Sequence, residues 1–294
     1  MKYITISDLS DTIRKNFHKI PHDIDFVVGV PRSGMLCATI ISEFLNVPLT
    51  DCDSFISGVK PGGGGRLVFH TRRKSIKTKE NVLVIDDTIN SGECMSKTKK
   101  KLELLKEKYN FIYAVVYLEG DSSNLIDFYL EDVRKYTNNQ TEIVLYEWNV
   151  FQHYDALMSR CIYDIDGVLC VNPPDERDEK EYLEHIKNAT PLFIPKTNIG
   201  ELLTYRLSKN RSITEDWLNR NGVKYGKLSM FKATTWDERN RSNISPEVFK
   251  GEYYKEQVWA KLFVESDDYQ ARRIFEISGK PVLCVETNKL YQKQ

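Results

Sequence analysis

Short apolar runs alternate with amphipathic stretches through the first half of the chain. Phe26–Val30 and Val82–Ile85 have the composition of buried strands, and Gly34–Leu45 carries apolar residues at helical spacing. A lysine-rich helix is predicted from about Cys94 to Lys108, and a further strand over Phe111–Leu118. This strand–helix–strand order predicts a mostly parallel sheet that is covered on both faces by helices.

A second series of alternating elements begins at Cys161. We expect strands at Cys161–Asp164, Phe263–Val264 and Val282–Val285, a helix from about Ile199 that leads into Leu202–Thr204, and an amphipathic helix over Ser212–Asn221. The fold class predicted for the whole chain is therefore α/β, with two doubly wound, mostly parallel-sheet domains. The chain of 294 residues is long enough for two separate cores. We place the domains at residues 1–155 and 156–294, with no proline- or glycine-rich linker between them.

The composition of the chain argues against several kinds of binding partner and of structural cross-link. Lysine plus arginine and aspartate plus glutamate each number 42, so the formal charge is zero and we expect no nucleic-acid partner. The six cysteines form no C-x-x-C pair, which argues against zinc and against a disulfide framework. The first residues lack the apolar core of a signal peptide, and no run of about 18 apolar residues could span a bilayer. We expect a cytoplasmic protein with no membrane partner; a homo-oligomer stays open.

Two predicted strands run straight into a pair of acids and a turn of small residues. The first strand leads into Asp86 and Asp87, and the second into Asp164 and Asp166. Acids at the carboxyl end of a buried strand lie where open α/β sheets bind their ligands. The alternative is that these acids only cap the helices that follow them.

The turn after Asp87 has the composition of a phosphate cradle. Asn90, Ser91 and Gly92 expose backbone N–H groups ahead of a predicted helix, whose dipole favours an anion. The two acids beside it would suit the hydroxyl groups of a sugar attached to that phosphate. An earlier strand–turn–helix segment, Val28–Met35, carries Arg32, whose guanidinium group can bind phosphate oxygens through two parallel N–H bonds.

These two segments, in this order, resemble the signature of type I phosphoribosyltransferases, which use phosphoribosyl pyrophosphate (PRPP). The resemblance implies displacement of pyrophosphate from the anomeric carbon by a ring nitrogen of a base-like acceptor, with Mg²⁺ bound mainly through the substrate. It also implies the PRPP-binding residues, which are Arg32, Ser33, Gly34, Asp86, Asp87, Thr88, Asn90, Ser91 and Gly92. The family commonly continues with Gly and Thr, whereas this chain has Glu93 and Cys94, which lowers the affinity expected for PRPP.

A glycine-rich segment lies between the two motifs. It includes four consecutive glycines, Gly62–Gly65, with Lys60 and Arg66 beside them. Such a segment is either a plain flexible loop or a lid that orders over an anionic ligand.

The second acidic motif, Asp164-Ile165-Asp166-Gly167, indicates phosphate chemistry of another kind. Side chains at i and i+2 of an extended segment face the same way, so one carboxylate can attack phosphorus while the other handles protons. The motif resembles the first motif of the haloacid dehalogenase (HAD) superfamily of phosphatases. The resemblance implies a phosphoester substrate, with Asp164 as nucleophile and Asp166 as general acid and base.

The later motifs of that superfamily also find matches in order along the chain. By the same resemblance Thr204 would bind the phosphoryl group, and Lys255, with Lys261 as the alternative, would neutralise its charge. The implied ligands of Mg²⁺ are Asp164, Asp166, Glu265 and Asp267. A solvated charge run is the alternative interpretation of residues 265–268.

Three functional hypotheses follow. The first is a bifunctional enzyme that joins a base-like acceptor to PRPP and removes the 5′-phosphate of the nucleotide product, or of a related phosphoester. The second is a PRPP sensor, in which the first domain binds without catalysis and regulates the phosphatase. The third is a binding module for a protein or nucleic-acid partner. The sequence does not identify the acceptor, the phosphoester or the oligomeric state.

Overall fold

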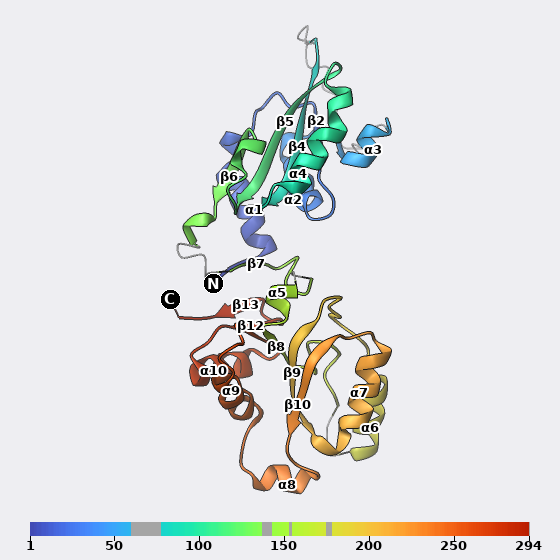
Figure 1. Ribbon diagram of the computed structural model, residues 1–294, viewed down its shortest axis with the longest axis vertical. Helices are drawn as coiled ribbons and strands as arrows, with labels where there is room; N and C mark the ends of the chain where they lie inside the picture. The colour runs from blue at the N-terminus through green and yellow to red at the C-terminus, as the bar shows by residue number, and fades with distance from the viewer. Residues whose placement is uncertain (60–77, 137–142, 153–154, 175–177, 294) are drawn as a thin grey trace. The chain divides into compact units, whose positions relative to one another are not determined.

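The chain folds into two compact units, which meet in the sequence between Trp148 and Asn149. The computed structural model describes residues 1–59, 78–136, 143–152, 155–174 and 178–293 (Figure 1). The glycine-rich segment that was considered as a lid falls on residues 60–77 and lies outside the described residues.

The amino-terminal unit is built on a five-stranded parallel sheet. Its strands, in spatial order, are β3 (Leu49–Asp51), β2 (Phe26–Gly29), β4 (Glu80–Ile89), β5 (Tyr109–Leu118) and β6 (Phe128–Asp132). A separate parallel pair joins β1 (Lys2–Ile4) to β7 (Val144–Tyr146). Every pairing between described strands of this unit is parallel, so the turns that follow β2 and β4 open at the same edge of the sheet.

Helices cover both faces of this sheet. Val27 of β2 packs in the core formed with α1 (Ile6–Lys15) and α2 (Gly34–Leu45), whereas its neighbour Val28 packs in the core that includes α3 (Cys52–Ile56) and α4 (Glu93–Leu102). Alternate strand residues point to opposite faces, so one strand contributes to both cores. The short 3₁₀ helices are η1 (Phe17–Lys19), η2 (Glu103–Leu105), η3 (Ser123–Leu125) and η4 (Arg134–Tyr136).

The carboxyl-terminal unit has a six-stranded sheet. Its spatial order is β10 (Tyr225–Phe231), β9 (Ile199–Leu207), β8 (Cys161–Tyr163), β11 (Leu262–Glu265), β12 (Val282–Cys284) and β13 (Lys289–Tyr291). All pairings are parallel except that of β12 with the edge strand β13. The strands β8, β9 and β11 therefore end side by side, which gathers the residues that follow them at one edge.

Helices again lie on both sides of the sheet. They are α5 (Asp155–Met158), α6 (Glu179–Asn188), α7 (Arg211–Arg220), α8 (Trp236–Arg241), α9 (Pro246–Glu256) and α10 (Asp268–Ser278), with η5 (Ser208–Asn210) after β9. Tyr254 of α9 and Ile274 of α10 pack against Ile162 and Phe263 of the sheet. In Figure 1, α6 and α7 lie beside β9 and β10 on the opposite side from α9 and α10.

The predicted α/β class with mostly parallel sheets is confirmed, as is the helix over Gly34–Leu45. The helix expected from Ile199 is wrong, because Ile199–Leu207 forms the strand β9, with neighbours on both sides. The helix expected to reach Lys108 ends at Leu102, and β4 continues beyond Ile85 through both acids to Ile89. Apolar runs flanked by polar residues do not distinguish a short helix from a central strand, since only the pairing decides.

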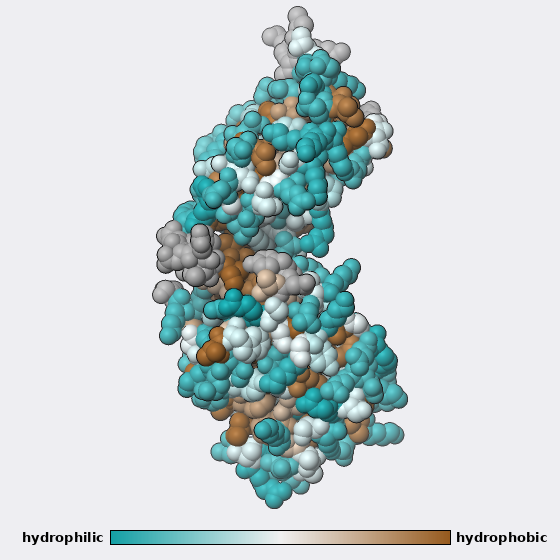
Figure 2. All heavy atoms as spheres, viewed as in Figure 1, coloured by the Kyte–Doolittle hydropathy of each residue, from teal (hydrophilic) through white to brown (hydrophobic). Residues whose placement is uncertain are grey.

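None of the described helices combines the length and apolar composition needed to cross a bilayer. The face shown in Figure 2 is mostly hydrophilic, with separate small apolar patches.

Candidate active sites

The amino-terminal site lies where β2 and β4 end. A cavity of about 270 Å³ is lined by Pro31, Ser33 and the continuous run from Asp86 to Met95. The run leaves β4 through the turn and enters α4, whose N-cap Gly92 has φ +75°, a conformation that favours glycine. The loop after β2 and the turn after β4 thus meet at one cavity.

Gly34 allows the two segments to touch. A Cβ at this position would lie 2.8 Å from Asp86 Oδ1 and 2.9 Å from the Ile85 carbonyl oxygen, and so would collide with β4. Arg32 is exposed and is not among the residues that line the cavity, whereas Ser33 is. The structure therefore brings Ser33, Gly34 and the acid pair together and places the Arg32 side chain outside this cavity.

The two acids are buried in the structure. Asp86 is 8 % exposed and Asp87 is 3 % exposed. Burial, followed by the charge of Asp87, raises the pKa of Asp86 well above its usual range. Asp86 Oδ1 accepts a hydrogen bond from the Asp87 backbone N–H (2.9 Å). Asp87 Oδ2 accepts one from Trp148 Nε1 (2.7 Å).

The bond from Trp148 to Asp87 was not predicted. Nothing in the position of Trp148 along the sequence indicates that it would bind a carboxylate 61 residues earlier. The link requires β7 and the chain after it to return beside β4, which is a property of the fold. Trp148 therefore holds the second acid of the motif from a segment 61 residues away.

The two departures from the family signature lie at the start of α4. Glu93 Oε1 accepts a hydrogen bond from Lys97 Nζ (2.6 Å), one turn along the helix, so its negative charge has a counter-charge. Cys94 also lines the cavity, and partial burial raises the pKa of its thiol. The Cys94 thiol remains a poorer hydrogen-bond donor than a hydroxyl.

The second site lies at the edge where β8, β9 and β11 end. A cleft of about 350 Å³ is lined by Asp164, Asp166 and residues from four other segments, which are Asn172–Pro174, Tyr205–Arg206, Pro246 and Lys250 of α9, and Glu265–Asp267 with Gln270. Gly167 has φ +75°, and a Cβ there would collide with the Ser266 side chain. The glycine of the motif therefore lets the chain turn next to β11.

Lys250, and not Lys255, is the lysine of this cleft. Lys250 Nζ donates to Asp164 Oδ2 and Glu265 Oε2, both at 2.7 Å, and its side chain is 3 % exposed. Lys255 is exposed and pairs with Glu252, and the alternative Lys261 is exposed as well. The prediction of Lys255 as the cleft lysine is therefore wrong. Position 250 lies one turn and a half earlier on α9, on the face that packs against the sheet.

Arg206 is the second cation that sequence reasoning missed. It is 1 % exposed and donates to both oxygens of Asp166, from Nε at 2.9 Å and from Nη2 at 2.6 Å. Burial alone would raise the pKa of Asp166, but the Arg206 guanidinium outweighs it and lowers that pKa. The position of Arg206, two residues after Thr204, could have suggested this role, since residues i and i+2 of a strand share a face.

Asp164 has a different electrostatic environment. Burial raises its pKa above the usual range, although Lys250 opposes the shift. Lys250 keeps its charge, because the carboxylates of Asp164 and Glu265 outweigh the effect of burial and raise its pKa. The two acids of one motif thus differ in their protonation behaviour.

The remaining predicted residues fall around this cleft. Glu265 is fully buried, and its oxygens accept bonds from Lys250 and from the Ser266 backbone N–H. Asp267 is exposed at the N-cap of α10, where it accepts from the Gln270 N–H at 2.7 Å. Thr204 does not line the cleft: it is fully buried in β9, and its hydroxyl oxygen accepts from the Arg206 backbone N–H at 3.2 Å. The prediction that the Thr204 hydroxyl faces a phosphoryl group in the cleft therefore differs from the structure, in which this side chain is buried outside the cleft.

The donor set of the cleft fits Mg²⁺. Its four predicted ligands are carboxylates, the class of ligand that this ion prefers. When all four are ionised, they leave an excess of two negative charges over Lys250 and Arg206, which matches a divalent cation. Glu265 is the least available of the four, because Lys250 and Ser266 already occupy its oxygens.

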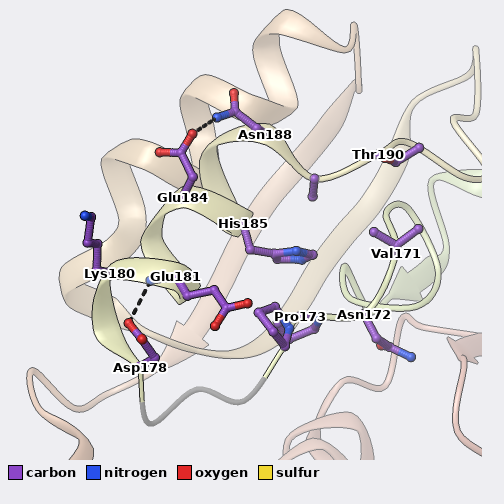
Figure 3. Close-up of a pocket in the computed structure, with 12 residues that line it drawn as sticks. Val171, Asn172, Pro173, Asp178, Lys180, Glu181, Glu184, His185, Asn188 and Thr190 are labelled. Atoms are coloured by element: carbon purple, nitrogen blue, oxygen red, sulfur yellow. Dashed lines mark hydrogen bonds between the residues drawn. The ribbon is translucent and has the colours of Figure 1, made fainter.

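A larger hollow of about 810 Å³ lies over α6 and shares Asn172–Pro174 with the cleft (Figure 3). His185 projects from α6 toward this loop, and burial lowers the pKa of its ring. Ligand atoms of Asp166, Cys170 and His185 lie within 4.8 Å of one another. A cation is disfavoured between them, because Arg206 contacts both Asp166 and Cys170.

Comparison with known proteins identifies the family. Residues 3–150, half of the chain, match the family model described as the phosphoribosyl transferase domain. The chain therefore belongs to this family, and the amino-terminal resemblance is confirmed at that level. A search of curated proteins found no match.

Solved structures resemble part of the chain. Xanthine-guanine-hypoxanthine phosphoribosyltransferase from Helicobacter pylori is 19 % identical, with 51 % of this chain and 93 % of that chain covered and a TM-score of 0.35. Orotate phosphoribosyltransferase from Aeropyrum pernix is 17 % identical, with 46 % and 75 % covered and a TM-score of 0.33. Leishmania donovani UMP synthase is 17 % identical, with 44 % of this chain and only 27 % of that chain covered and a TM-score of 0.32.

Proposed function

We propose that the protein transfers a phosphoribosyl group from PRPP to a base-like acceptor and hydrolyses a phosphomonoester at a second site. The observation that supports the transfer is the single cavity lined by Ser33, the acid pair and the Thr88–Gly92 turn. In this proposal the turn binds the 5′-phosphate through backbone N–H groups, and Asp86 and Asp87 bind the ribose hydroxyls. The protein's part is to position PRPP and to stabilise the departing pyrophosphate.

Pyrophosphate release tests the transfer. Purified protein is mixed with PRPP, Mg²⁺ and a panel of purine and pyrimidine bases, and the released pyrophosphate is measured. The proposal expects release with at least one base and loss of that release in the Asp86→Asn, Asp87→Asn double variant. Tight PRPP binding without release with any base would favour the sensor hypothesis instead.

The observation that supports hydrolysis is the cleft that holds Asp164 and Asp166 with Lys250 between two carboxylates. An Asp164 oxygen attacks phosphorus, the bond from phosphorus to the leaving oxygen breaks, and an aspartyl-phosphate forms. An alcohol leaving group also needs a proton, which Asp166 gives only in molecules where its carboxyl group is protonated, whereas an aryloxide leaves without one. A water then attacks phosphorus, Asp166 takes its proton, and phosphate leaves as Asp164 is regenerated.

The other groups of the cleft stabilise charge and geometry in this mechanism. Lys250 neutralises negative charge beside Asp164, and Arg206 fixes the orientation of the Asp166 carboxylate. Mg²⁺ held by the predicted carboxylates would add positive charge at the phosphoryl oxygens. Because Arg206 keeps Asp166 ionised, an aryl phosphate, whose leaving group needs no proton, is the most direct first substrate.

Hydrolysis is tested with such an aryl phosphate in the presence and absence of Mg²⁺. We expect turnover that requires the ion. If both activities are present, the natural order is transfer followed by hydrolysis, which would convert a base and PRPP to a nucleoside. Linkage of the two units on one chain raises the effective concentration of the shared nucleotide. Absence of hydrolysis across aryl and nucleoside phosphates would remove this half of the proposal.

The sensor hypothesis has one structural observation in its favour. Asp87 is already engaged by Trp148, and both acids are nearly inaccessible. If the amino-terminal unit is a sensor, PRPP binds there, is not consumed, and changes the rate of phosphoester hydrolysis. The rate of aryl phosphate hydrolysis with and without PRPP, in the absence of any base, distinguishes the two hypotheses.

A further inference from the structure

The carboxyl-terminal unit holds another cavity, apart from the cleft. Its volume is about 490 Å³, within the range of small-molecule pockets, and its walls come from α6, the segment after β9, and α8. Leu207, the last residue of β9, lines it, so the cavity lies at the same end of the sheet as the cleft. None of the residues predicted from the sequence to be functional lines it.

Asn210 lines this cavity, and the nitrogen of its amide is buried beneath the cavity surface. The residue is 4 % exposed, and its Nδ2 has no hydrogen-bond partner within the described part of the chain. Asparagine at a helix N-cap normally bonds the first turn, but at this N-cap of α7 the side chain makes no such bond. Its backbone, at φ −90° and ψ 13°, departs from the extended conformation that capping needs. The first turn of α7 therefore leaves the amide without its usual partner.

Trp236 also lines the cavity, and its indole N–H is a second buried donor without a hydrogen-bond partner in the regions that the structure describes. The chain has four tryptophans, all within the described residues, and three indole N–H groups donate to a protein acceptor. Trp236 Nε1 is the exception: it is buried and has no partner. A buried N–H without an acceptor is costly, and the described protein atoms supply none to either of these two groups beside the cavity.

The rest of the lining indicates what kind of acceptor fits. Tyr182 and Trp236 supply aromatic surface, which favours a planar ring. Lys209 is paired with Glu179, and Asp237 adds a further carboxylate, so the charged rim carries one excess negative charge. That charge disfavours an anion. The complementary ligand is therefore neutral, planar and rich in acceptor oxygens.

A stack of three side chains forms the wall between this cavity and the cleft. The Arg239 guanidinium carbon lies 4.6 Å from the centre of the Tyr205 ring and 4.8 Å from that of Trp236. Tyr205 lines the cleft, and Trp236 lines the cavity. The two spaces are thus distinct, although their walls are continuous.

We propose that this cavity binds a neutral planar heterocycle that carries ring carbonyl groups. The carbonyl oxygens accept hydrogen bonds from Asn210 Nδ2 and Trp236 Nε1, and the ring packs against the aromatic walls. Both N–H groups are buried without the ligand, so binding requires both side chains to rotate about their terminal torsions, which are soft degrees of freedom. The site depends on neither of the two proposed activities, and their failure would leave it unaffected.

The four indole groups allow a site-resolved test with the full-length protein. Uridine is titrated into ¹⁵N-labelled protein, and the indole N–H resonances are followed after assignment by Trp→Phe variants. We expect saturable movement of the Trp236 resonance, with D-ribose and benzyl alcohol producing little change. The Trp148 resonance monitors binding at the amino-terminal site, where its indole contacts Asp87. Movement of Trp148 alone, or of no resonance, would overturn the proposal.

Variants of Asn210 provide a second test. Asn210→Asp keeps the shape of the side chain but replaces the N–H donors with an acceptor, and we expect uridine affinity to fall about ten-fold or more. Asn219→Asp introduces the same charge at an exposed position of α7 that does not line the cavity, and should change affinity less than two-fold. Equal affinity in wild type and Asn210→Asp would contradict the site, and thermal unfolding verifies that each variant is folded.

Discussion

Lys250 Nζ lies 2.7 Å from Asp164 Oδ2 and at the same distance from Glu265 Oε2. The ammonium group therefore joins the end of β8 to the end of β11 inside a cleft that only the folded chain creates. A buried cation between two carboxylates is costly to disrupt, because removal leaves both carboxylates without their counter-charge.

Replacement of Lys250 distinguishes it from the lysine that the sequence suggested. Lys250→Met should lower aryl phosphate hydrolysis by about 100-fold or more, since charge beside the nucleophile is lost. Lys255→Met, on the exposed side of the same helix, should retain activity within about two-fold. Steady-state kinetics on both variants, with circular dichroism as a folding control, makes the comparison. The reverse ranking would refute the assignment of Lys250.

Asp164→Asn tests the nucleophile with little change in volume. The amide cannot form the aspartyl-phosphate, so hydrolysis should fall by several orders of magnitude. The Lys250–Glu265 pair remains, and the variant should fold. Rapid-quench experiments with ³²P-labelled substrate should trap a phosphoenzyme in the wild type and none in the variant. Near wild-type turnover would rule out this role for Asp164.

Gly34→Ala tests the contact between the two PRPP-binding segments. The added methyl would meet Asp86 Oδ1 at 2.8 Å and the Ile85 carbonyl at 2.9 Å, and the backbone oxygen cannot move away cheaply. We expect a loss of about 1–3 kcal/mol in the free energy of unfolding of the amino-terminal unit, together with weaker PRPP binding. Ser33→Ala, which adds no atom beside β4, should leave the free energy of unfolding nearly unchanged. Urea unfolding and calorimetric titration provide the two measurements.

Trp148→Phe removes the hydrogen bond to Asp87. The carboxylate would then be buried without this donor, and the free energy of unfolding should fall by about 1–3 kcal/mol. Trp259→Phe loses an indole bond to the neutral Gln257 side chain and should cost less. If denaturant unfolding shows the same loss of free energy for both variants, the bond to Asp87 contributes no more to stability than the bond to Gln257.

Glu119 links stability to pH in the amino-terminal unit. Burial, followed by the charge of Asp87, raises its pKa above the usual value for glutamate. Protonated Glu119 is therefore favoured by the fold, and its contribution is fully present below the unfolded-state pKa and is lost as pH rises through the folded-state pKa. Glu119→Gln should unfold at a higher temperature than wild type at pH 7, and this gain should shrink as pH falls toward 4. A gain that is independent of pH would contradict the assignment.

The sequence by itself determined the features that depend on neighbouring residues. The alternation of apolar runs with helical stretches predicts the parallel α/β class, and Gly34–Leu45 is helical as expected because its pattern is local. The acid-containing motifs were also recognisable, since a strand, an acid pair and a glycine turn are adjacent in the chain. Asp86–Asp87 and Asp164–Asp166 each line a cavity at the end of a strand.

The tertiary structure decided which distant side chains complete each site. Lys250 and Lys255 lie on one helix and look equivalent in sequence, but only the packing of α9 on the sheet buries the first and exposes the second. Trp148 reaches Asp87 only because the chain after β7 returns beside β4. Electrostatic and hydrogen-bonding partners are set by three-dimensional distance, and a local pattern contains no information on contacts that form tens of residues away.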